Sequence, residues 1–255
     1  MEVIAIINQK GGVGKTTTAH NFGIGLALKG YKVLFLDLDQ GSNLSYALDV
    51  LELGEATGSD TSQLFTGAKV KDLIITTNKG WDAIPGSGTL ATLEVDKEDE
   101  RRAHKVYDAL QEVKSKYDYV IMDTPPGLGI ITINALTAAD KIIIPALAAV
   151  FSLQGVGQLS RTLDAIRETT NPSLSVEGIL LTLYKGRSTL TREVTAMMEQ
   201  TASLLHTKVF NSRIREYMKH QEAQAYQEST LEYAPKTAAA ADYMALVEEF
   251  LEGTK

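Results

Sequence analysis

The feature that most constrains this chain is a glycine-rich turn between an apolar run and a helical pattern, over residues 3–17. The β-branched run Val3–Ile7 predicts a buried strand, and Lys15–Thr17 opens the helical pattern. Glycine lets the backbone turn at positive φ and approach a ligand closely. A strand, such a turn and a helix in this order predict a phosphate-binding loop in an α/β fold.

Each part of this turn can hold a polyphosphate in its own way. The backbone N–H groups of the turn can wrap the phosphates, and the start of the helix adds free N–H groups and a positive dipole end. The Lys15 ammonium would reach the β and γ phosphates, and the Thr16 hydroxyl would bind Mg²⁺. The predicted nucleotide-binding residues of the turn are Gly11, Gly12, Val13, Gly14, Lys15, Thr16 and Thr17.

The loop departs at one position from the commonest phosphate-binding spacing, G-x-x-x-x-G-K-[ST]. That spacing requires a glycine where Gln9 stands, and a second lysine, Lys10, precedes the turn. Two lysines beside a glycine turn repel each other unless an anion compensates them. The pair of lysines therefore favours a bound anion at this turn.

The run Asn-Gln-Lys-Gly-Gly-Val-Gly-Lys-Thr-Thr-Thr, residues 8–18, resembles the deviant Walker A motif of the ParA/MinD family of P-loop ATPases. It is most similar to the ParA/Soj branch, which partitions plasmids and chromosomes. The resemblance implies an ATPase that uses ATP and Mg²⁺, in which Lys10 crosses an ATP-sandwiched homodimer to touch the partner's nucleotide. It therefore adds Lys10 to the nucleotide-binding residues and makes Lys10 and Lys15 catalytic candidates.

Composition limits the kind of protein that this chain can form. A chain of 255 residues, 44% of them hydrophobic, can bury one large α/β core, and no repeat or linker divides it. We therefore expect residues 1–255 to form a single ParA-type P-loop ATPase domain. The chain has no cysteine, which excludes disulfides, thiolate metal sites and the iron–sulfur cluster of the nitrogenase iron-protein relatives.

Hydrophobic patterning also bears on location. No apolar run approaches the roughly 20 residues that a transmembrane helix needs. The first residues enter a strand pattern directly, which leaves no room for a signal peptide. We therefore expect a cytoplasmic protein, and the resemblance adds an association with the nucleoid.

Two carboxylates follow the second apolar run. Val33–Leu36 predicts a buried strand, and Asp37 and Asp39 follow it on one side, where open α/β sheets bind ligands. This resembles the second motif of the family. The resemblance implies that Asp39 positions or polarises the attacking water and that Asp37 lies near the Mg²⁺ shell. The family usually has a proline after the later aspartate, but Gln40 stands here, so the loop can be set differently.

A third motif combines a strand, an aspartate and two prolines. Tyr119–Asp123 predicts a β-branched strand that delivers Asp123 at its carboxyl end, the Walker B arrangement in which an aspartate holds Mg²⁺. Pro125-Pro126-Gly127 cannot continue a strand or helix and predicts a loop near the γ-phosphate that can sense ATP against ADP. The predicted metal-binding residues are Thr16, Asp37 and Asp123.

Strands and helices alternate along the rest of the chain. Strands are predicted at Lys141–Pro145 and Glu177–Tyr184, and helices at Ile130–Ala139 and Ser152–Arg167. This alternation predicts an α/β fold with a doubly wound, mostly parallel sheet and helices on both faces, the P-loop NTPase class.

Other segments carry weaker patterns. We expect a short helix at Thr61–Phe65, a strand edge at Val70–Thr76, a strand at Trp81–Gly86 and a solvated helix start at Lys97–Arg102. A C-terminal helix is expected over Thr237–Leu251. Its acidic residues argue against a membrane-targeting helix of the MinD kind, which needs a basic polar face.

The segment 185–220 has a net positive charge in a chain that is acidic overall. Seven basic and three acidic side chains give it a net charge of +4, which leaves −11 for the rest of a chain whose total is −7. Such asymmetry is typical of a face that contacts phosphates without reading sequence. The resemblance to Soj-type proteins implies that Arg187 and Lys219 bind nonspecific DNA in the ATP-bound dimer, and Arg213 and Arg215 are further candidates.

The family typically has Pro-Arg-Asn in the later loop, with the proline near adenine. Arg215-Glu216-Tyr217 replaces it here, so the adenine contacts stay open.

These features lead to one hypothesis, a ParA/Soj-type DNA-partitioning ATPase. Its ATP-sandwich homodimer would bind DNA nonspecifically, a centromere-binding ParB-like partner would accelerate hydrolysis, and hydrolysis would release the DNA. One alternative is a MinD-like ATPase at the membrane, which would bind lipid vesicles with ATP. Another is a metabolic ATP-dependent enzyme of the same fold, which would need a second substrate pocket. A tyrosine-kinase relative is not supported, because no C-terminal tyrosine cluster is present.

Overall fold

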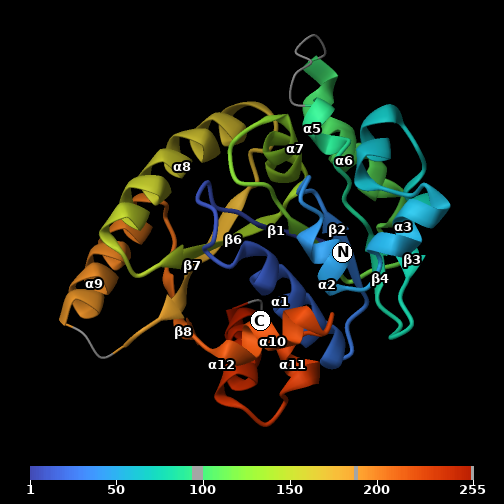
Figure 1. Ribbon diagram of the computed structural model, residues 1–255. Coiled ribbons are helices and arrows are strands. Elements are labelled where there is room, and N and C mark those ends of the chain that lie inside the picture. Colours follow the sequence, from blue (N-terminus) through green and yellow to red (C-terminus); the bar gives the residue numbers. More distant parts are fainter. Residues whose placement is uncertain (94–99, 187–188, 254–255) are drawn as a thin grey trace.

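A computed structural model describes residues 1–93, 100–186 and 189–253 of the chain. In that part of the chain, eight strands form one sheet in the order β3-β4-β2-β5-β1-β6-β7-β8 (Figure 1). Every neighbouring pair is parallel except β3 and β4. The strands are β1 (Glu2–Ile6), β2 (Val33–Asp37), β3 (Ile75–Thr76), β4 (Asp82–Ile84), β5 (Tyr119–Asp123), β6 (Lys141–Leu147), β7 (Ser175–Tyr184) and β8 (Val209–Arg215).

Helices connect these strands. The α-helices are α1 (Lys15–Leu28), α2 (Asn43–Ala47), α3 (Leu51–Thr57), α4 (Val70–Leu73), α5 (Leu90–Leu93), α6 (Lys105–Leu110), α7 (Ile130–Ala138), α8 (Val150–Thr169), α9 (Thr189–Leu204), α10 (Met218–Ala225), α11 (Thr230–Tyr233) and α12 (Ala238–Gly253). Short 3₁₀ helices lie at Thr61–Thr66, Glu100–His104 and Gln111–Val113. None of the described helices is long and apolar enough to cross a membrane.

The sheet is buried on both faces, which explains why its strands are apolar runs and not alternating ones. Side chains of β1 alternate between two cores. Ile4 and Ile6 pack with residues of α1 and α12, whereas Val3 and Ala5 pack with residues of α7, α8 and α9. Figure 1 shows these two groups of helices on opposite sides of the sheet. The predicted doubly wound, mostly parallel fold is confirmed.

The strand order also brings the three motifs together. β1 lies between β5 and β6 in the sheet. The strands β2 to β5 lie on one side of β1, and β6 to β8 lie on the other, so the order of the strands reverses at β1. Ligands bind outside the carboxyl ends of strands at such a switch point. There Asp123 is in register with Ile6 of β1 and with Asp37 of β2.

Some of the weaker expectations were wrong. The predicted strand edge at Val70–Thr76 is mostly helix α4, and only Ile75–Thr76 forms a strand, because Val70 and Leu73 pack into the core at a helical spacing. The expected helix start at Lys97–Arg102 lies partly outside the described residues, and Glu100–His104 forms a 3₁₀ helix. The predicted C-terminal helix is confirmed as α12.

The acidic side chains of α12 cover the open edge of the sheet. β8 is an edge strand, and unpaired edge N–H groups invite pairing with other chains. The Glu249 carboxylate accepts hydrogen bonds from the backbone N–H groups of Asn211 and Ser212, both at 2.7 Å. Asp242 accepts one from the N–H of Arg215 at 3.1 Å. Some acidic side chains of α12 therefore stabilise the fold by accepting hydrogen bonds from the backbone of β8.

Candidate functional site

The glycine-rich loop between β1 and α1 has the backbone that a phosphate loop requires. Gly12 and Gly14 have φ of +71° and +83°, a region that favours glycine. Val13 lies between them and is buried, and its carbonyl accepts a hydrogen bond from the Thr182 hydroxyl at 2.8 Å. The loop is therefore anchored to β7, and α1 begins directly after it at Lys15.

Lys15 is the buried lysine of the loop. Its side chain is 7% exposed, and its ammonium donates to the Lys10 carbonyl at 3.3 Å. Burial lowers the pKa of Lys15, while the nearby carboxylates of Asp123 and Asp39 act in the opposite direction. A largely desolvated ammonium in this place can bind an anion strongly, because little water has to be removed from it on binding.

Lys10 is the exposed lysine of the same loop. The Asn8 side chain fixes its backbone, because Asn8 accepts the Lys10 N–H at 2.9 Å and donates to the Pro145 carbonyl at 2.7 Å. Among the described residues, the Lys10 ammonium has no ion pair. The loop thus presents one lysine inward and one to solvent.

Thr16 and Asp123 meet at the carboxyl ends of β1 and β5. The Thr16 hydroxyl donates to Asp123 Oδ2 at 2.6 Å. Asp123 is 0% exposed, and its Oδ1 has no hydrogen-bond partner in the described structure. Burial, followed by the nearby Asp37 carboxylate, raises the pKa of Asp123 well above its ordinary value. A hydroxyl and a buried carboxylate with an orphan oxygen form a donor set that suits Mg²⁺, a hard cation that prefers oxygen ligands.

The two aspartates after β2 have different surroundings. Asp37 is 2% exposed, and burial raises its pKa to about 6. Asp39 is half-buried and lines the main cavity of the described structure. One oxygen of Asp39, Oδ1, accepts the Gly41 N–H at 2.9 Å within the loop itself. Of the two, Asp39 is the one placed to act on a bound molecule.

That cavity has a volume of about 840 Å³ and extends from the glycine-rich loop to α10. It is large enough for a small-molecule ligand such as a nucleotide. Pro126 of the predicted sensing loop contributes to the wall near the phosphate end. The sequence analysis did not identify the residues at the other end, Met218, His220, Gln221 and Gln224, and left the role of Tyr217 open. These residues form a second wall of the cavity, away from the phosphate loop.

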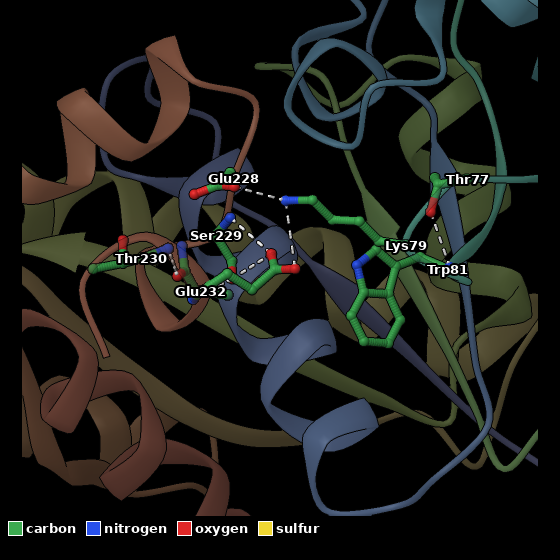
Figure 2. Close-up of polar contacts among 8 residues, drawn as sticks. Thr77, Lys79, Trp81, Glu228, Ser229, Thr230 and Glu232 are labelled. Atoms are coloured by element: carbon green, nitrogen blue, oxygen red, sulfur yellow. Dashed lines mark hydrogen bonds and ion pairs between the residues drawn. The ribbon is translucent and has the colours of Figure 1, made fainter. Parts of the chain in front are cut away.

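Buried polar contacts hold α10 and α11 against α1. The Thr230 N–H donates to Asn21 Oδ1 at 2.7 Å, and the Thr230 hydroxyl lies 2.9 Å from His220 Nδ1. Figure 2 shows Lys79, from the turn between β3 and β4, reaching Glu228 at 3.1 Å and Glu232 at 3.6 Å. The far wall of the cavity is therefore tied to the phosphate-loop helix and to the opposite half of the sheet.

The predicted DNA-binding residues lie in three different settings. Arg187 lies outside the described residues. Arg215 forms an ion pair with Asp242 at 2.6 Å, and Lys219 forms one with Glu222 at 2.6 Å. Arg213 donates to the Ser212 carbonyl at 3.2 Å and has no ion pair with a described residue. Lys219 lies in the first turn of α10, so the loop expected at this position is a helix.

The chain is similar to known proteins over nearly its whole length. The family model for an AAA domain matches residues 1–176. The chromosome partitioning protein ParA of Caulobacter vibrioides (strain NA1000 / CB15N) is 35% identical over 255 residues, which cover 98% of this chain and 94% of that protein. The sporulation initiation inhibitor protein Soj of Bacillus subtilis (strain 168) is 36% identical over 250 residues, 97% of each chain. A crystal structure of cobyrinic acid a,c-diamide synthase from Mycobacterium smegmatis, with a bound ATP analogue and magnesium, has a TM-score of 0.85 at 29% identity and covers 100% of this chain and 96% of that one.

Proposed function

This chain belongs to the ParA/Soj family of chromosome-partitioning P-loop ATPases, and we propose that it couples ATP-driven pairing of two subunits to DNA binding. The chain is an ATPase that uses ATP and Mg²⁺. We further propose that residues 1–255 act as one ATPase domain in the cytoplasm, on the nucleoid, with a ParB-like centromere-binding protein as partner.

The observation that carries the proposal is the difference in burial between the two lysines of the loop, Lys15 and Lys10. Lys15 is buried and lines the cavity at the phosphate loop, where it would face the phosphates of the subunit's own nucleotide. Lys10 is exposed, without an ion pair in the described part of the chain, at the edge of the same loop. A lysine in that position is suited to an anion on another molecule. A second subunit carrying ATP supplies such an anion, and ADP supplies one phosphate fewer.

The remaining site residues fit one hydrolytic cycle. The loop from Gly11 to Thr17 holds the phosphates, and Thr16 and Asp123 hold Mg²⁺, which supplies charge neutralisation at the β and γ phosphates when bound. Asp39 orients the attacking water. The loop Pro125–Gly127 responds to the loss of the γ-phosphate, the pair of subunits opens, and the DNA is released.

The role of Asp39 gives a direct prediction. Asp39→Ala should lower ATP turnover by about 100-fold or more, the usual effect of removing a group that handles the proton of the attacking water. ATP binding and pairing should persist, because the phosphate loop is unchanged. Phosphate release measured at saturating ATP tests this. Turnover at the wild-type rate would mean that the altered loop after Asp39 has moved this role to another residue.

A second prediction concerns the basic face. Arg187→Ala and Arg213→Ala should each weaken DNA binding and reduce the slope of log affinity against log salt by about 1. Lys219→Ala and Arg215→Ala should also weaken it, but less, because Glu222 and Asp242 already compensate those charges. ATP turnover without DNA should stay at the wild-type rate. Fluorescence anisotropy with a random-sequence duplex measures all four variants, and Lys71→Ala, at an exposed position of α4, is the matched control.

If none of these variants changes the affinity or its salt dependence, the DNA-binding face lies elsewhere.

One observation favours a second candidate, a metabolic ATP-dependent enzyme, namely the similarity to the Mycobacterium smegmatis synthase. Such an enzyme needs room for a second substrate. A separate cavity of about 480 Å³ lies near Glu2, Tyr119 and Lys141, where their strands begin. That is the opposite edge of the sheet from the phosphate loop, so a substrate bound in this separate cavity would lie far from the nucleotide phosphates.

The test of the proposed function is a DNA gel shift with ATP, with ADP and without nucleotide, each at two salt concentrations. We expect a shift with ATP that weakens at the higher salt, and little or none in the other two conditions. Equal DNA binding in all three conditions would overturn the proposed coupling.

A further inference from the structure

A buried hydrogen-bond network lies directly beneath Asp39. One oxygen of the Asp37 carboxylate, Oδ2, accepts the Ser45 N–H at 2.8 Å and the Ser45 hydroxyl at 2.6 Å. The other, Oδ1, accepts the backbone N–H of Asp39 at 3.1 Å. The Ser45 oxygen in turn accepts the Gly86 N–H at 2.8 Å. Ser45 therefore joins the end of β2 to the segment that follows β4.

Packing closes this network from the side of Gly86. A Cβ atom added at Gly86 would lie 2.8 Å from the Asp39 carbonyl oxygen and 3.0 Å from Asp37 Cγ. Only glycine can approach the backbone so closely without displacing it. The Thr61 hydroxyl donates to the Asp37 carbonyl at 2.7 Å and holds the same stretch of backbone from another direction.

The loop beyond Asp39 continues in a tight turn. The Ser42 N–H donates to the Asp39 carbonyl at 2.9 Å, and Ser42 itself has a φ of +51°. The Gly41 N–H occupies Oδ1 of Asp39 at 2.9 Å. In the described structure this leaves Oδ2 of Asp39 without a hydrogen bond, on a side chain that lines the cavity. The backbone of Asp39 is held from both sides while one carboxylate oxygen stays available.

Asp37 and Asp123 differ in a way that separates their roles. Asp123 keeps an oxygen without a partner, as a metal ligand would before binding. Both oxygens of Asp37 accept hydrogen bonds from the protein, so neither is left without a partner as Asp123 Oδ1 is. Asp37 has the contacts of a side chain that holds a loop in place.

We propose that Ser45 and Asp37 form a positioning unit for Asp39: Ser45 fixes the Asp37 carboxylate, and Asp37 fixes the backbone of Asp39 so that its unbonded oxygen faces the attacking water. This replaces the expectation that Asp37 belongs to the Mg²⁺ shell. The proposal rests on the hydrolytic role proposed for Asp39. In this chain, these contacts would restrict the backbone of the loop after Asp39, as the proline that the family usually has there would.

The test is Ser45→Ala, which removes the hydroxyl that donates to Asp37 and accepts from Gly86. We expect the single-turnover rate of ATP hydrolysis to fall about tenfold, the size of effect that follows from losing one hydrogen bond to a charged group. The dissociation constant for a fluorescent ATP analogue and the Mg²⁺ concentration that half-saturates its binding should stay within about twofold of wild type. Ser45→Thr retains a hydroxyl and should recover part of the rate.

The matched control is Ser152→Ala, since Ser152 is a buried serine whose hydroxyl has no hydrogen-bond partner in the described structure. It should hydrolyse ATP at the wild-type rate. Asp37→Asn separates positioning from metal binding, because an amide has a single accepting oxygen and cannot accept from Ser45 and from the Asp39 N–H at the same time. It should slow hydrolysis as Ser45→Ala does and leave the half-saturating Mg²⁺ concentration unchanged.

Two outcomes would overturn the proposal. One is a wild-type hydrolysis rate in Ser45→Ala while Asp39→Ala is slow, which leaves the role of Asp39 intact and removes only the positioning unit. The other is a rise of tenfold or more in the half-saturating Mg²⁺ concentration of Asp37→Asn, which would make Asp37 a ligand. If Asp39→Ala itself hydrolyses ATP at the wild-type rate, the proposed hydrolytic role fails first, and the two failures are distinguishable.

Discussion

Replacing Lys15 by alanine is expected to abolish ATP binding at concentrations that saturate the wild-type protein. Its ammonium is buried at the end of the cavity formed by the phosphate loop. Hydrogen bonds to charged groups contribute about 1.5–3 kcal/mol each, so losing contacts with two phosphates should weaken binding by about 100-fold or more. The carboxylates of Asp123 and Asp39, whose interaction with Lys15 favours its charged form, would then face the phosphates uncompensated.

Titration with a fluorescent ATP analogue in the presence of Mg²⁺ measures this effect. Lys29→Ala is the matched control, because Lys29 follows the end of the same helix and forms an exposed ion pair with Glu248. The control should bind ATP with wild-type affinity and unfold within a few degrees of wild type. Tight ATP binding by Lys15→Ala would remove the phosphate-loop assignment.

Replacing Lys10 by glutamate is expected to lower ATP turnover by about 100-fold, as the loss of one preorganised charge at a phosphoryl-transfer site commonly does. The affinity of a single subunit for ATP should fall much less, since Lys10 is exposed and does not line its own subunit's cavity. The reversed charge would instead meet the phosphates of the second subunit and repel them. Turnover and ATP affinity, measured on the same preparation, separate these two effects.

Lys71→Glu makes the same charge change at an exposed position of α4 and should leave both quantities unchanged. A loss of ATP affinity in Lys10→Glu as large as that in Lys15→Ala would mean that Lys10 serves its own nucleotide. That result would leave the ATPase assignment intact and contradict the shared site.

The sequence could predict those parts of the site whose residues form short motifs of neighbouring residues. Lys15 and Thr16 follow a glycine turn, and the turn's positive φ angles require the glycines that mark it. Asp123 ends an apolar strand and Asp39 follows another by two residues, and the rules for parallel sheets place such strand ends at one edge. Their meeting, with Thr16 and Asp123 2.6 Å apart across 107 residues, follows from that topology.

The far wall of the cavity could not be predicted in the same way. Met218 and Gln221 line the cavity only because Thr230 is bonded to Asn21 and Lys79 reaches Glu228 across 149 residues, contacts that no local pattern encodes. The charge count over residues 185–220 likewise treated Arg215 and Lys219 as available. Arg215 is held by Asp242 of α12 and Lys219 by Glu222 of its own helix, and both partners lie outside the segment over which the charge was summed.

The contacts that hold the segment after Asp39 also could not be predicted from the sequence. The sequence shows that a proline is absent there, but Ser45 and Gly86, which hold the loop from below, lie 41 residues apart. Ser45 looks like an ordinary helix residue until the fold places it against Asp37.

Sedimentation velocity of the Asp39→Ala protein tests whether ATP joins two subunits through Lys10. We expect a monomer without nucleotide and with ADP, a dimer with ATP and Mg²⁺, and a monomer again when Lys10→Glu is added to Asp39→Ala. A dimer that forms with ATP equally well in the double variant would contradict a nucleotide sandwich closed by Lys10.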